Sequence, residues 1–364
     1  MKLTSNRRLV APGIAALTLG MALTGCGAAN ETSGASSKLS GKLDGSGSSA
    51  QSAAMDAWRS AFQTANGNVT INYDPAGSGA GVTKFNAGGV DFAGSDAALD
   101  PKAGEVAAAK KRCGADALEV PDYVSPIAIV YNLKSVSKLQ LSAKTIAGIF
   151  DGKITKWNNS AIKAENPGVT LPPKAISPVH RSDESGTTKN FTDYLSKAGN
   201  GGWSYKADKV WPIKSGEGAS GTSGVISAVT QGDGAIGYAD DSQAGSLSKV
   251  SIKVGSAYVA PSAAGAAKAL QASPLDTGRP AGDMAIKVDR TTTAAGAYPL
   301  FLASYLIACP TYPKGKAEIV KAFLSYIIST KGQQEAAKNA GSAPLPTSIQ
   351  AKAQAIVGKI TAKG

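Results

Sequence analysis

The sequence is poor in the residues on which many enzymes and metal sites depend. It has a single histidine, His180, and three cysteines among 364 residues, and only 6% of the residues are aromatic. One histidine cannot supply a zinc cluster or a histidine relay. The G-x-S-x-G nucleophile motif and the P-loop are missing, and no spacing of acidic residues points to paired-carboxylate hydrolysis. We therefore predict no catalytic residue, no metal site and no cofactor.

One long, predominantly apolar stretch stands near the N-terminus. It covers about residues 9–23, contains no acidic residue and follows Lys2, Arg7 and Arg8. This order of charged and apolar residues is typical of an export signal, which we assign to residues 1–25.

The apolar stretch ends in the letters LTGC at residues 23–26, which resemble the bacterial lipobox. In that motif the signal is cleaved before the cysteine, so we predict a lipid such as palmitate on Cys26 and attachment to the outer face of the cell membrane. An ordinary cleavage site or a transmembrane anchor are the alternatives, but the stretch is short for a bilayer span. Residues 26–37, rich in Gly, Ala and Ser, are then a flexible tether.

The charge balance favours anionic ligands. Without residues 1–25 the chain keeps 35 basic and 26 acidic residues, a net charge of +9. Such a balance attracts anions in general. The lysines are scattered, without a basic run interleaved with aromatic residues, so we predict no nucleic-acid binding.

The cysteines predict one disulfide. With Cys26 assigned to the lipid, Cys113 and Cys309 remain as one pair in an exported protein. Exported chains keep disulfides, so we expect this pair to join two segments that are far apart in sequence. Two separate buried thiols are the alternative.

Helical and strand-like segments alternate along the chain, which predicts an α/β fold. The mature length of about 339 residues suits two lobes better than one small domain. The apolar run Ile127–Tyr131 is typical of a buried strand that opens a second lobe, and Tyr298–Ile307 indicates a return to the first lobe. We therefore assign residues 38–125 and 301–364 to lobe I and residues 126–300 to lobe II.

Three loops place small hydroxyl groups beside glycine at predicted helix starts: Ser48-Ser49, Ser78 and Ser185–Thr187. Each loop can offer backbone N–H and side-chain O–H donors to an anion. Arg181 adds a planar, two-pronged cationic donor just before the third loop. Alternatively, each hydroxyl only caps its helix and Arg181 only pairs with Asp183.

A further glycine-rich segment, Gly216–Gly221, satisfies the G-x-G-x-x-G pattern and precedes a helical run. A dinucleotide site is one interpretation. However, Trp211-Pro212 interrupts the strand that should precede the motif, and such a cofactor is not expected outside the cytoplasm. We interpret the segment as a glycine-rich hinge or a wall of a cleft.

Several motifs together resemble one family, the phosphate-binding lipoproteins of bacterial high-affinity phosphate ABC transporters (the PstS family of the periplasmic-binding-protein superfamily). The likeness covers about residues 39–346, and the motifs occur in the family's order. They are GSGAGV at 77–82, VDFAGSD at 90–96, IFDGKITKWN at 149–158, RSDESGT at 181–187 and GAIGY at 234–238.

The resemblance implies a two-lobed Venus-flytrap fold, in which each lobe is a mixed sheet flanked by helices and the ligand lies in a cleft between the lobes. It also implies a set of phosphate contacts: Ser49, Ala50, Ser78, Asp96, Arg181, Ser185, Gly186 and Thr187. The first loop departs from the family pattern, because many relatives have Thr followed by an aromatic residue where this chain has Ser49-Ala50. Backbone donation by Ala50 is expected to persist.

A physical argument assigns Asp96 a role in selectivity. A carboxylate in an anion site repels its ligand unless the ligand can donate a proton to it. Phosphate near neutral pH keeps a proton, whereas sulfate has none, so Asp96 should accept phosphate and reject sulfate. Alternatively, Asp96 only caps the N-terminus of the helix that follows it. Asp183 is interpreted as the residue that holds Arg181 in position.

From these observations we predict a monomeric, lipid-anchored receptor that captures inorganic phosphate and hands it to the permease subunits of an ABC importer. A secreted phosphatase or phosphoryl-transfer enzyme is an alternative, although no nucleophile–base pair or metal set is evident. A binding protein for sulfate or molybdate is another.

Overall fold

The computed structural model describes residues 39–364 of the chain. The predicted export signal (1–25), the lipid on Cys26 and the tether (26–37) lie outside the described residues. Within the described part, none of the helices combines the length and the apolar character needed to cross a membrane.

Eleven of the described strands belong to one mixed sheet, whose main path runs β2-β1-β3-β11-β4-β8-β6-β7, with β9 joined to β4, β5 and β10. A small separate ribbon pairs β12 with β13. The strands are β1 (Gly41–Gly47), β2 (Val69–Asp74), β3 (Phe92–Ser95), β4 (Leu118–Tyr131), β5 (Leu139–Leu141), β6 (Ser177–Arg181), β7 (Glu217–Ala219), β8 (Ala235–Asp240), β9 (Ser248–Val254), β10 (Ala257–Val259), β11 (Phe301–Ala308), β12 (Thr311–Tyr312) and β13 (Thr361–Ala362).

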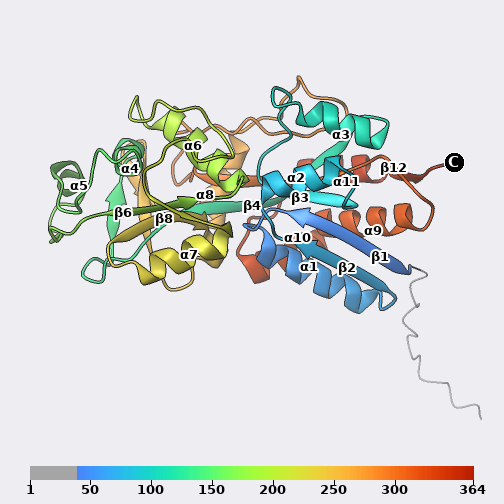
Figure 1. The fold of residues 1–364 in the computed structure, drawn as a ribbon, viewed down its shortest axis with the longest axis horizontal. Coiled ribbons are helices and arrows are strands. Elements are labelled where there is room, and N and C mark those ends of the chain that lie inside the picture. Colours follow the sequence, from blue (N-terminus) through green and yellow to red (C-terminus); the bar gives the residue numbers. More distant parts are fainter. Residues whose placement is uncertain (1–38) are drawn as a thin grey trace, which may run out of the picture. The chain divides into compact units, whose positions relative to one another are not determined.

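Strand β4 links the two halves of the fold, and every residue of it is buried. Its first part pairs antiparallel with β11, from Leu118 opposite Ala308 to Pro126 opposite Phe301. Its second part pairs antiparallel with β8, beginning with Ile127 opposite Asp240. Figure 1 shows β4 running from the part of the fold that contains α1, α2 and α9 into the part that contains α6 and α7.

Helices cover both parts of this sheet (Figure 1). Helix α1 shows why they form, because Met55, Trp58 and Phe62 recur at spacings of three and four residues and bury one face. The helices are α1 (Ser52–Ala65), α2 (Ser78–Asn86), α3 (Glu105–Cys113), α4 (Ala143–Phe150), α5 (Ser160–Glu165), α6 (Gly186–Ala198), α7 (Gly221–Gln231), α8 (Ala263–Gln271), α9 (Lys316–Ile328), α10 (Thr330–Ala340) and α11 (Thr347–Val357), with a 3₁₀ turn η1 (Asp241–Gln243).

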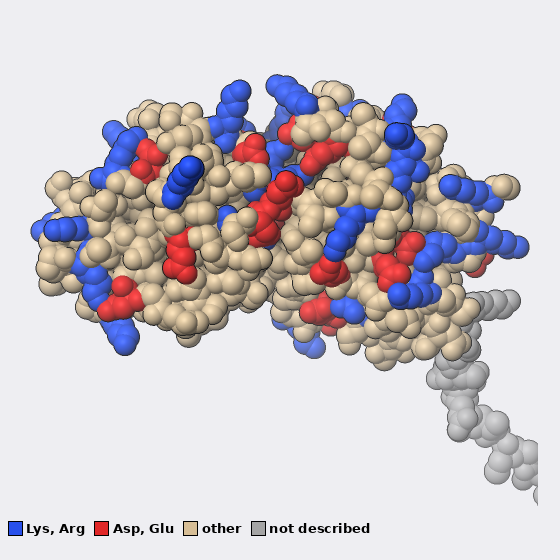
Figure 2. Space-filling model, viewed as in Figure 1, with Lys and Arg blue, Asp and Glu red and all other residues tan. Residues whose placement is uncertain are grey.

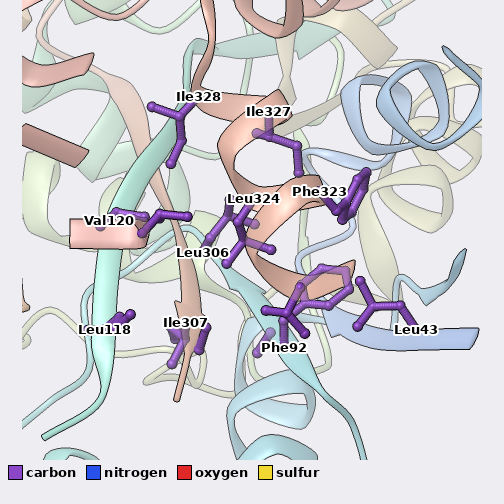
Figure 3. Close-up of a cluster of buried hydrophobic side chains, with 14 of the residues drawn as sticks. Leu43, Phe92, Leu118, Val120, Leu306, Ile307, Phe323, Leu324, Ile327 and Ile328 are labelled. Carbon is purple, nitrogen blue, oxygen red and sulfur yellow. The ribbon is translucent and has the colours of Figure 1, made fainter. Parts of the chain in front are cut away.

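Two large apolar cores make the fold two-lobed. The first core packs α9 against β1, β3 and β11. Phe323 of α9 lies toward Phe92 and Leu43, and Leu324 lies beside Leu306 (Figure 3). We call the elements around this core lobe I; they include α1, α2, α3 and the C-terminal helices. Complete burial of one such side chain stabilises the fold by about 1.5–3 kcal/mol, so the many buried side chains of this core contribute much of the stability of lobe I.

The second core is rich in aromatic rings and defines lobe II. Phe191 of α6 stacks on Tyr238 of β8, with ring centroids 4.2 Å apart, and Phe150 of α4 meets Phe191 edge-on at 4.8 Å. Helix α7 packs on β6 and β8 through a smaller cluster that includes Val179 and Val225. The predicted two-lobed α/β fold is thereby confirmed.

The predicted disulfide is present. Cys113 at the end of α3 is bonded to Cys309 just after β11, across 196 residues of sequence. Both cysteines are buried against the first core, so the bond ties α3 to the strand that leads between the lobes.

Candidate anion-binding site

The N-terminus of α6 forms one wall of the candidate site. Ser185 caps this helix, since its hydroxyl accepts a 3.2 Å hydrogen bond from the backbone N–H of Thr188. Ser185, Gly186 and Thr187 are buried. The first backbone N–H groups of a helix lack partners within the helix, and the helix dipole places partial positive charge there. The cap therefore leaves the first N–H groups of the helix available as donors to an anion.

Gly186 lies where the two lobes touch. A Cβ atom on Gly186 would lie 2.6 Å from the Ser78 hydroxyl and 2.8 Å from the Asp96 Cβ, both in lobe I. A Cβ atom essentially never lies within 3.0 Å of a non-bonded heavy atom, so only glycine permits this approach. The structure is thus the closed form, with the start of α6 directly against the lobe I loops.

Arg181 ends strand β6 and is held by Asp183. Its Nε donates to Asp183 Oδ1 at 2.7 Å and a terminal nitrogen donates to Oδ2 at 2.5 Å, which is a bidentate pair. Burial raises the pKa of Asp183, but the hydrogen bonds and charge of Arg181 outweigh burial and leave that pKa below its ordinary value. Arg181 is 2% exposed, so Asp183 fixes the direction of a buried cation.

Asp96 supplies the acceptor from lobe I. Thr187 of lobe II donates to its Oδ2 at 3.1 Å, and Ser304 of β11 donates to its Oδ1 at 2.8 Å. Burial raises the pKa of Asp96, while the Ser48 and Ser304 hydroxyls and the charge of Arg181 act in the opposite direction. Asp96 is therefore a buried carboxylate whose contacts come from both lobes.

Ser78 begins helix α2 beside Asp96. Its hydroxyl accepts a 3.1 Å hydrogen bond from the Asp96 backbone N–H. One residue on, the N–H of Gly79 donates to the carbonyl of Glu184 at 3.0 Å, again between the lobes. The loop before α2 requires glycine, because Gly77 has φ of +101°. These contacts bring the start of α2 against the start of α6.

The first loop is placed differently from the other two. The Ser49 hydroxyl lies 3.1 Å from the Thr222 hydroxyl and accepts a 3.1 Å hydrogen bond from the Thr222 N–H at the start of α7. The N–H of Ala50 donates to the Ser48 hydroxyl at 3.0 Å. In this closed form the Ser49 hydroxyl and the Ala50 N–H are thus engaged with protein groups, while burial raises the pKa of Asp96 and a hydrogen bond from the Ser48 hydroxyl opposes that rise.

The segment with the G-x-G-x-x-G pattern forms a wall of the same junction. Its last glycine, Gly221, donates its N–H to Asp183 Oδ1 at 2.9 Å, and the following Thr222 contacts Ser49. The start of α7 thereby supports both Asp183 and the first loop, which fits the predicted wall of a cleft.

Other residues with polar contacts around the site were not predicted from the sequence. Ser304 is one of them, although its pattern could have indicated a buried polar contact, because it is a lone hydroxyl between apolar residues of a buried strand. Asn190 is another, and its side-chain amide donates to the carbonyl of Asp96 at 2.6 Å. Gln243 donates to the carbonyls of Ser49 and Ala50 at 2.9 and 2.8 Å, and no local pattern marks it.

A charged cavity of about 700 Å³ lies beside Asp96, between α6 and the loop that follows β3. Six basic and four acidic side chains line it, including Lys189 and Arg290 of lobe II. The excess of basic groups favours the approach of anions from this side.

His180, the single histidine, stacks on Trp211 with ring centroids 4.8 Å apart and an interplanar angle of 9°. Its Nδ1 lies 2.9 Å from the carbonyl oxygen of Arg181. These contacts give the ring a packing role next to the start of the Arg181 loop.

Comparison with known proteins agrees with this fold. Residues 32–331 match the family model described as a PBP superfamily domain, the class of two-lobed binding proteins. The chain is 38% identical over 357 residues to the phosphate-binding protein PstS2 of Mycobacterium bovis BCG, covering 94% of this chain and 95% of that protein. It is 39% identical over 347 residues to PstS 3 of Mycobacterium tuberculosis, covering 93% and 92%. The chain belongs to the PBP superfamily and, within it, to the PstS family.

Solved structures share the fold. A phosphate-binding protein from Stenotrophomonas maltophilia superposes with a TM-score of 0.67 at 20% identity, covering 87% of this chain and 94% of that one. A phosphate ABC transporter substrate-binding protein from Clostridium perfringens, described as putative and solved with bound phosphate, superposes with a TM-score of 0.59 at 22% identity, covering 82% and 98%.

Proposed function

We propose that this protein is the extracytoplasmic receptor of an ABC-type phosphate importer, and that it captures inorganic phosphate between its lobes and delivers it to the membrane permease. The observation that carries the proposal is the meeting of Asp96 from lobe I with Thr187 at the N-terminus of α6 from lobe II, 3.1 Å apart. A helix N-terminus attracts an anion, and a buried carboxylate opposite it demands a ligand that carries a proton.

Phosphate meets both demands. Arg181 and the first N–H groups of α6 compensate the negative charge of phosphate. Asp96 accepts a hydrogen bond from the phosphate oxygen that keeps its proton. Sulfate would face Asp96 with two acceptors and no proton between them. An unpaired buried contact of this kind costs on the order of several kcal/mol, about a thousandfold in affinity.

We assign the ligand contacts to Ser49, Ala50, Ser78, Asp96, Arg181, Ser185, Gly186 and Thr187, with Asp183 in support of Arg181. Ser49 and Ala50 take part when their present bonds to Thr222 and Ser48 are exchanged for bonds to the ligand. The other donors and Asp96 lie around the junction between α2 and α6.

Closure follows from the distribution of these residues. Lobe I, assigned to residues 38–125 and 301–364, carries Asp96, whereas lobe II, assigned to residues 126–300, carries Arg181. A ligand that contacts both lobes binds the closed form more tightly than the open form and shifts the population toward closure. Release requires that the permease favour the open form.

The placement outside the cytoplasm rests on the PstS family and on the export signal. We assign residues 1–25 to a cleaved signal and Cys26 to a lipid anchor, joined to the binding lobes by residues 26–37. The protein acts as a monomer without cofactor or metal. Basic side chains are spread over the face seen in Figure 2 and form no single dense patch there, so this face offers no continuous basic stripe to a nucleic acid.

Titration calorimetry of the mature chain with phosphate and with sulfate tests the proposal. We expect one phosphate per chain and at least about a thousandfold preference over sulfate. Tighter binding of sulfate or molybdate would make the protein a receptor for another oxyanion. A chromogenic phosphate ester tests the enzyme alternative: steady turnover, inhibited by one equivalent of phosphate, would identify a phosphatase.

A further inference from the structure

Two ion pairs join the lobes beside the candidate site. Lys189 of α6 lies 2.9 Å from Asp100 of lobe I. Lys209, in the loop after α6, pairs with Glu105, the first residue of α3. Both cations belong to lobe II and both anions to lobe I, so neither pair can exist unless the lobes are closed.

The two anions are held on one short turn that begins at the ligand site. Asp100 follows Asp96 by four residues, and its Oδ1 accepts the N–H groups of Lys102 and Ala103 at 2.8 and 3.2 Å. Glu105 accepts the N–H of Asp100 at 2.7 Å. The carboxylates are therefore already ordered within lobe I and lose little freedom when the lobes close.

The two cations are tied to the residue that caps α6. The backbone N–H of Ser185 donates to the carbonyl of Lys209 at 2.9 Å, and the N–H of Lys189 donates to the carbonyl of Ser185 at 3.1 Å. A restraint on either lysine is thus transmitted directly to the helix start that faces the ligand.

The pair of Lys209 with Glu105 is the more costly one to break because it is more buried. The side chains of Lys209 and Glu105 are 8% and 18% exposed, compared with 25% and 32% for Lys189 and Asp100. Exposed pairs are weakened by solvent and contribute little. Removing one partner of a buried pair leaves the other charge without compensation, which is costly.

We propose that Asp100, Glu105, Lys189 and Lys209 form an ionic clasp that holds the lobes closed over the bound anion. Figure 2 shows the surface hollowed between the positions of α3 and α6, with charged side chains on its walls; a cavity of about 180 Å³ lies there, lined by all four residues of the clasp. The inference rests on the proposed function and assigns control of ligand release to residues outside the ligand set.

The clasp predicts a specific kinetic effect. Its bonds form only when the lobes are closed, so they slow dissociation and leave association nearly unchanged. They do not touch the ligand, so selectivity between phosphate and sulfate does not depend on them. Higher salt concentration should speed dissociation from the wild type more than from a protein without the clasp.

The test measures phosphate association and dissociation rates by stopped flow on the mature chain and its variants Glu105→Gln, Lys209→Met and the double variant. We expect each single variant to release phosphate at least about tenfold faster, with an association rate within about twofold of the wild type and an unchanged phosphate-to-sulfate ratio. In the double variant the dissociation rate should rise by less than the product of the two single-variant increases, because residues in direct contact share one interaction that can be lost only once.

Lys249→Met is the matched control. Lys249 pairs with Asp241 within lobe II at 2.6 Å, so the variant removes one positive charge from lobe II without breaking a contact between the lobes. It should leave both rates unchanged. Asp100→Asn and Lys189→Met repeat the test at the more exposed pair, with an expected acceleration of about two- to fivefold, and they serve if a substitution at Lys209 prevents folding.

The clasp would be overturned if Glu105→Gln and Asp100→Asn released phosphate at the wild-type rate. It would also be overturned if the increase in dissociation rate of the double variant equalled the product of the two single-variant increases. The proposed function fails in a different way: the wild type itself would then not bind phosphate in calorimetry.

Discussion

Thr187 Oγ1 donates a 3.1 Å hydrogen bond to Asp96 Oδ2 across 91 residues of sequence, and each residue comes from a different lobe. This bond brings the electropositive start of α6 against a buried acceptor. Ser78 lies beside this bond, and the contributions of Arg181, Asp96 and Gly186 can each be tested separately.

Arg181 is expected to contribute the main positive charge. Arg181→Ala should weaken phosphate binding by about 2 kcal/mol or more, about thirtyfold, because a buried charge-assisted contact is lost. Calorimetry measures the change. The control is Arg59→Ala, which removes an arginine that pairs with Asp56 on the surface of α1 and should leave phosphate affinity unaltered. Equal phosphate affinities of the wild type, Arg181→Ala and Arg59→Ala would exclude Arg181 from the site.

Asp96→Asn should narrow the preference for phosphate over sulfate, because the amide can donate to an anion that carries no proton. The ratio of the two dissociation constants is the measured quantity. Asp56→Asn, at an exposed position (70% of the side chain), is the control for loss of one negative charge. An unaltered ratio in Asp96→Asn would assign Asp96 to a structural role.

Gly186→Ala tests whether closure needs the close approach of the lobes. The added methyl group would lie 2.6 Å from the Ser78 hydroxyl, so the closed form should be destabilised by about 1–3 kcal/mol and phosphate bound at least several-fold more weakly. Gly67→Ala, where no atom lies within 4 Å of the added Cβ, should bind as the wild type does. Matching affinities for the two variants would contradict the closed geometry.

The disulfide is expected to stabilise the fold without shaping the site. Replacing Cys113 and Cys309 together with alanine should lower the free energy of unfolding by about 2–5 kcal/mol, as measured by urea denaturation, while phosphate affinity stays within about twofold. Mass spectrometry that found free thiols at both positions of the wild type would refute the bond itself.

The buried carboxyl group of Asp240 is expected to make the free energy of unfolding depend on pH. Burial raises its pKa to about 7, although Ser242 and Tyr123 donate hydrogen bonds to it at 3.0 Å. The folded state therefore holds this proton more tightly than the unfolded state, whose pKa is near 3.8. This stabilisation is complete below about pH 4 and is lost as the pH rises through about 7.

The free energy of unfolding of the wild type should accordingly fall relative to that of Asp240→Asn between about pH 4 and pH 7, by up to about 1.4 kcal/mol per pH unit. Urea denaturation at several pH values gives this difference. Parallel curves for the two proteins would show that Asp240 does not titrate in this range.

Local patterns sufficed for much of the fold. The spacing of Met55, Trp58 and Phe62 predicts α1, the apolar run Ile127–Tyr131 predicts the buried second part of β4, and the hydroxyl–glycine pairs mark the starts of α2 and α6. These predictions succeed because helix faces, strand burial and caps depend on residues within a few positions of each other.

The sequence by itself also determined the local contacts of the Arg181 segment, because the Arg181–Asp183 pair and the Ser185 cap form within a few residues. Only the tertiary structure decided which residues of lobe I lie opposite this segment. The bonds of Asp96 to Thr187, of Ser304 to Asp96 and of Lys209 to Glu105 join residues 91, 208 and 104 positions apart. The bond of Ser304 to Asp96 depends on the pairing of β11 with β3 inside lobe I, and the other two bonds depend on how the lobes close about β4 and β11. Tertiary packing decides both, and no local sequence pattern predicts them.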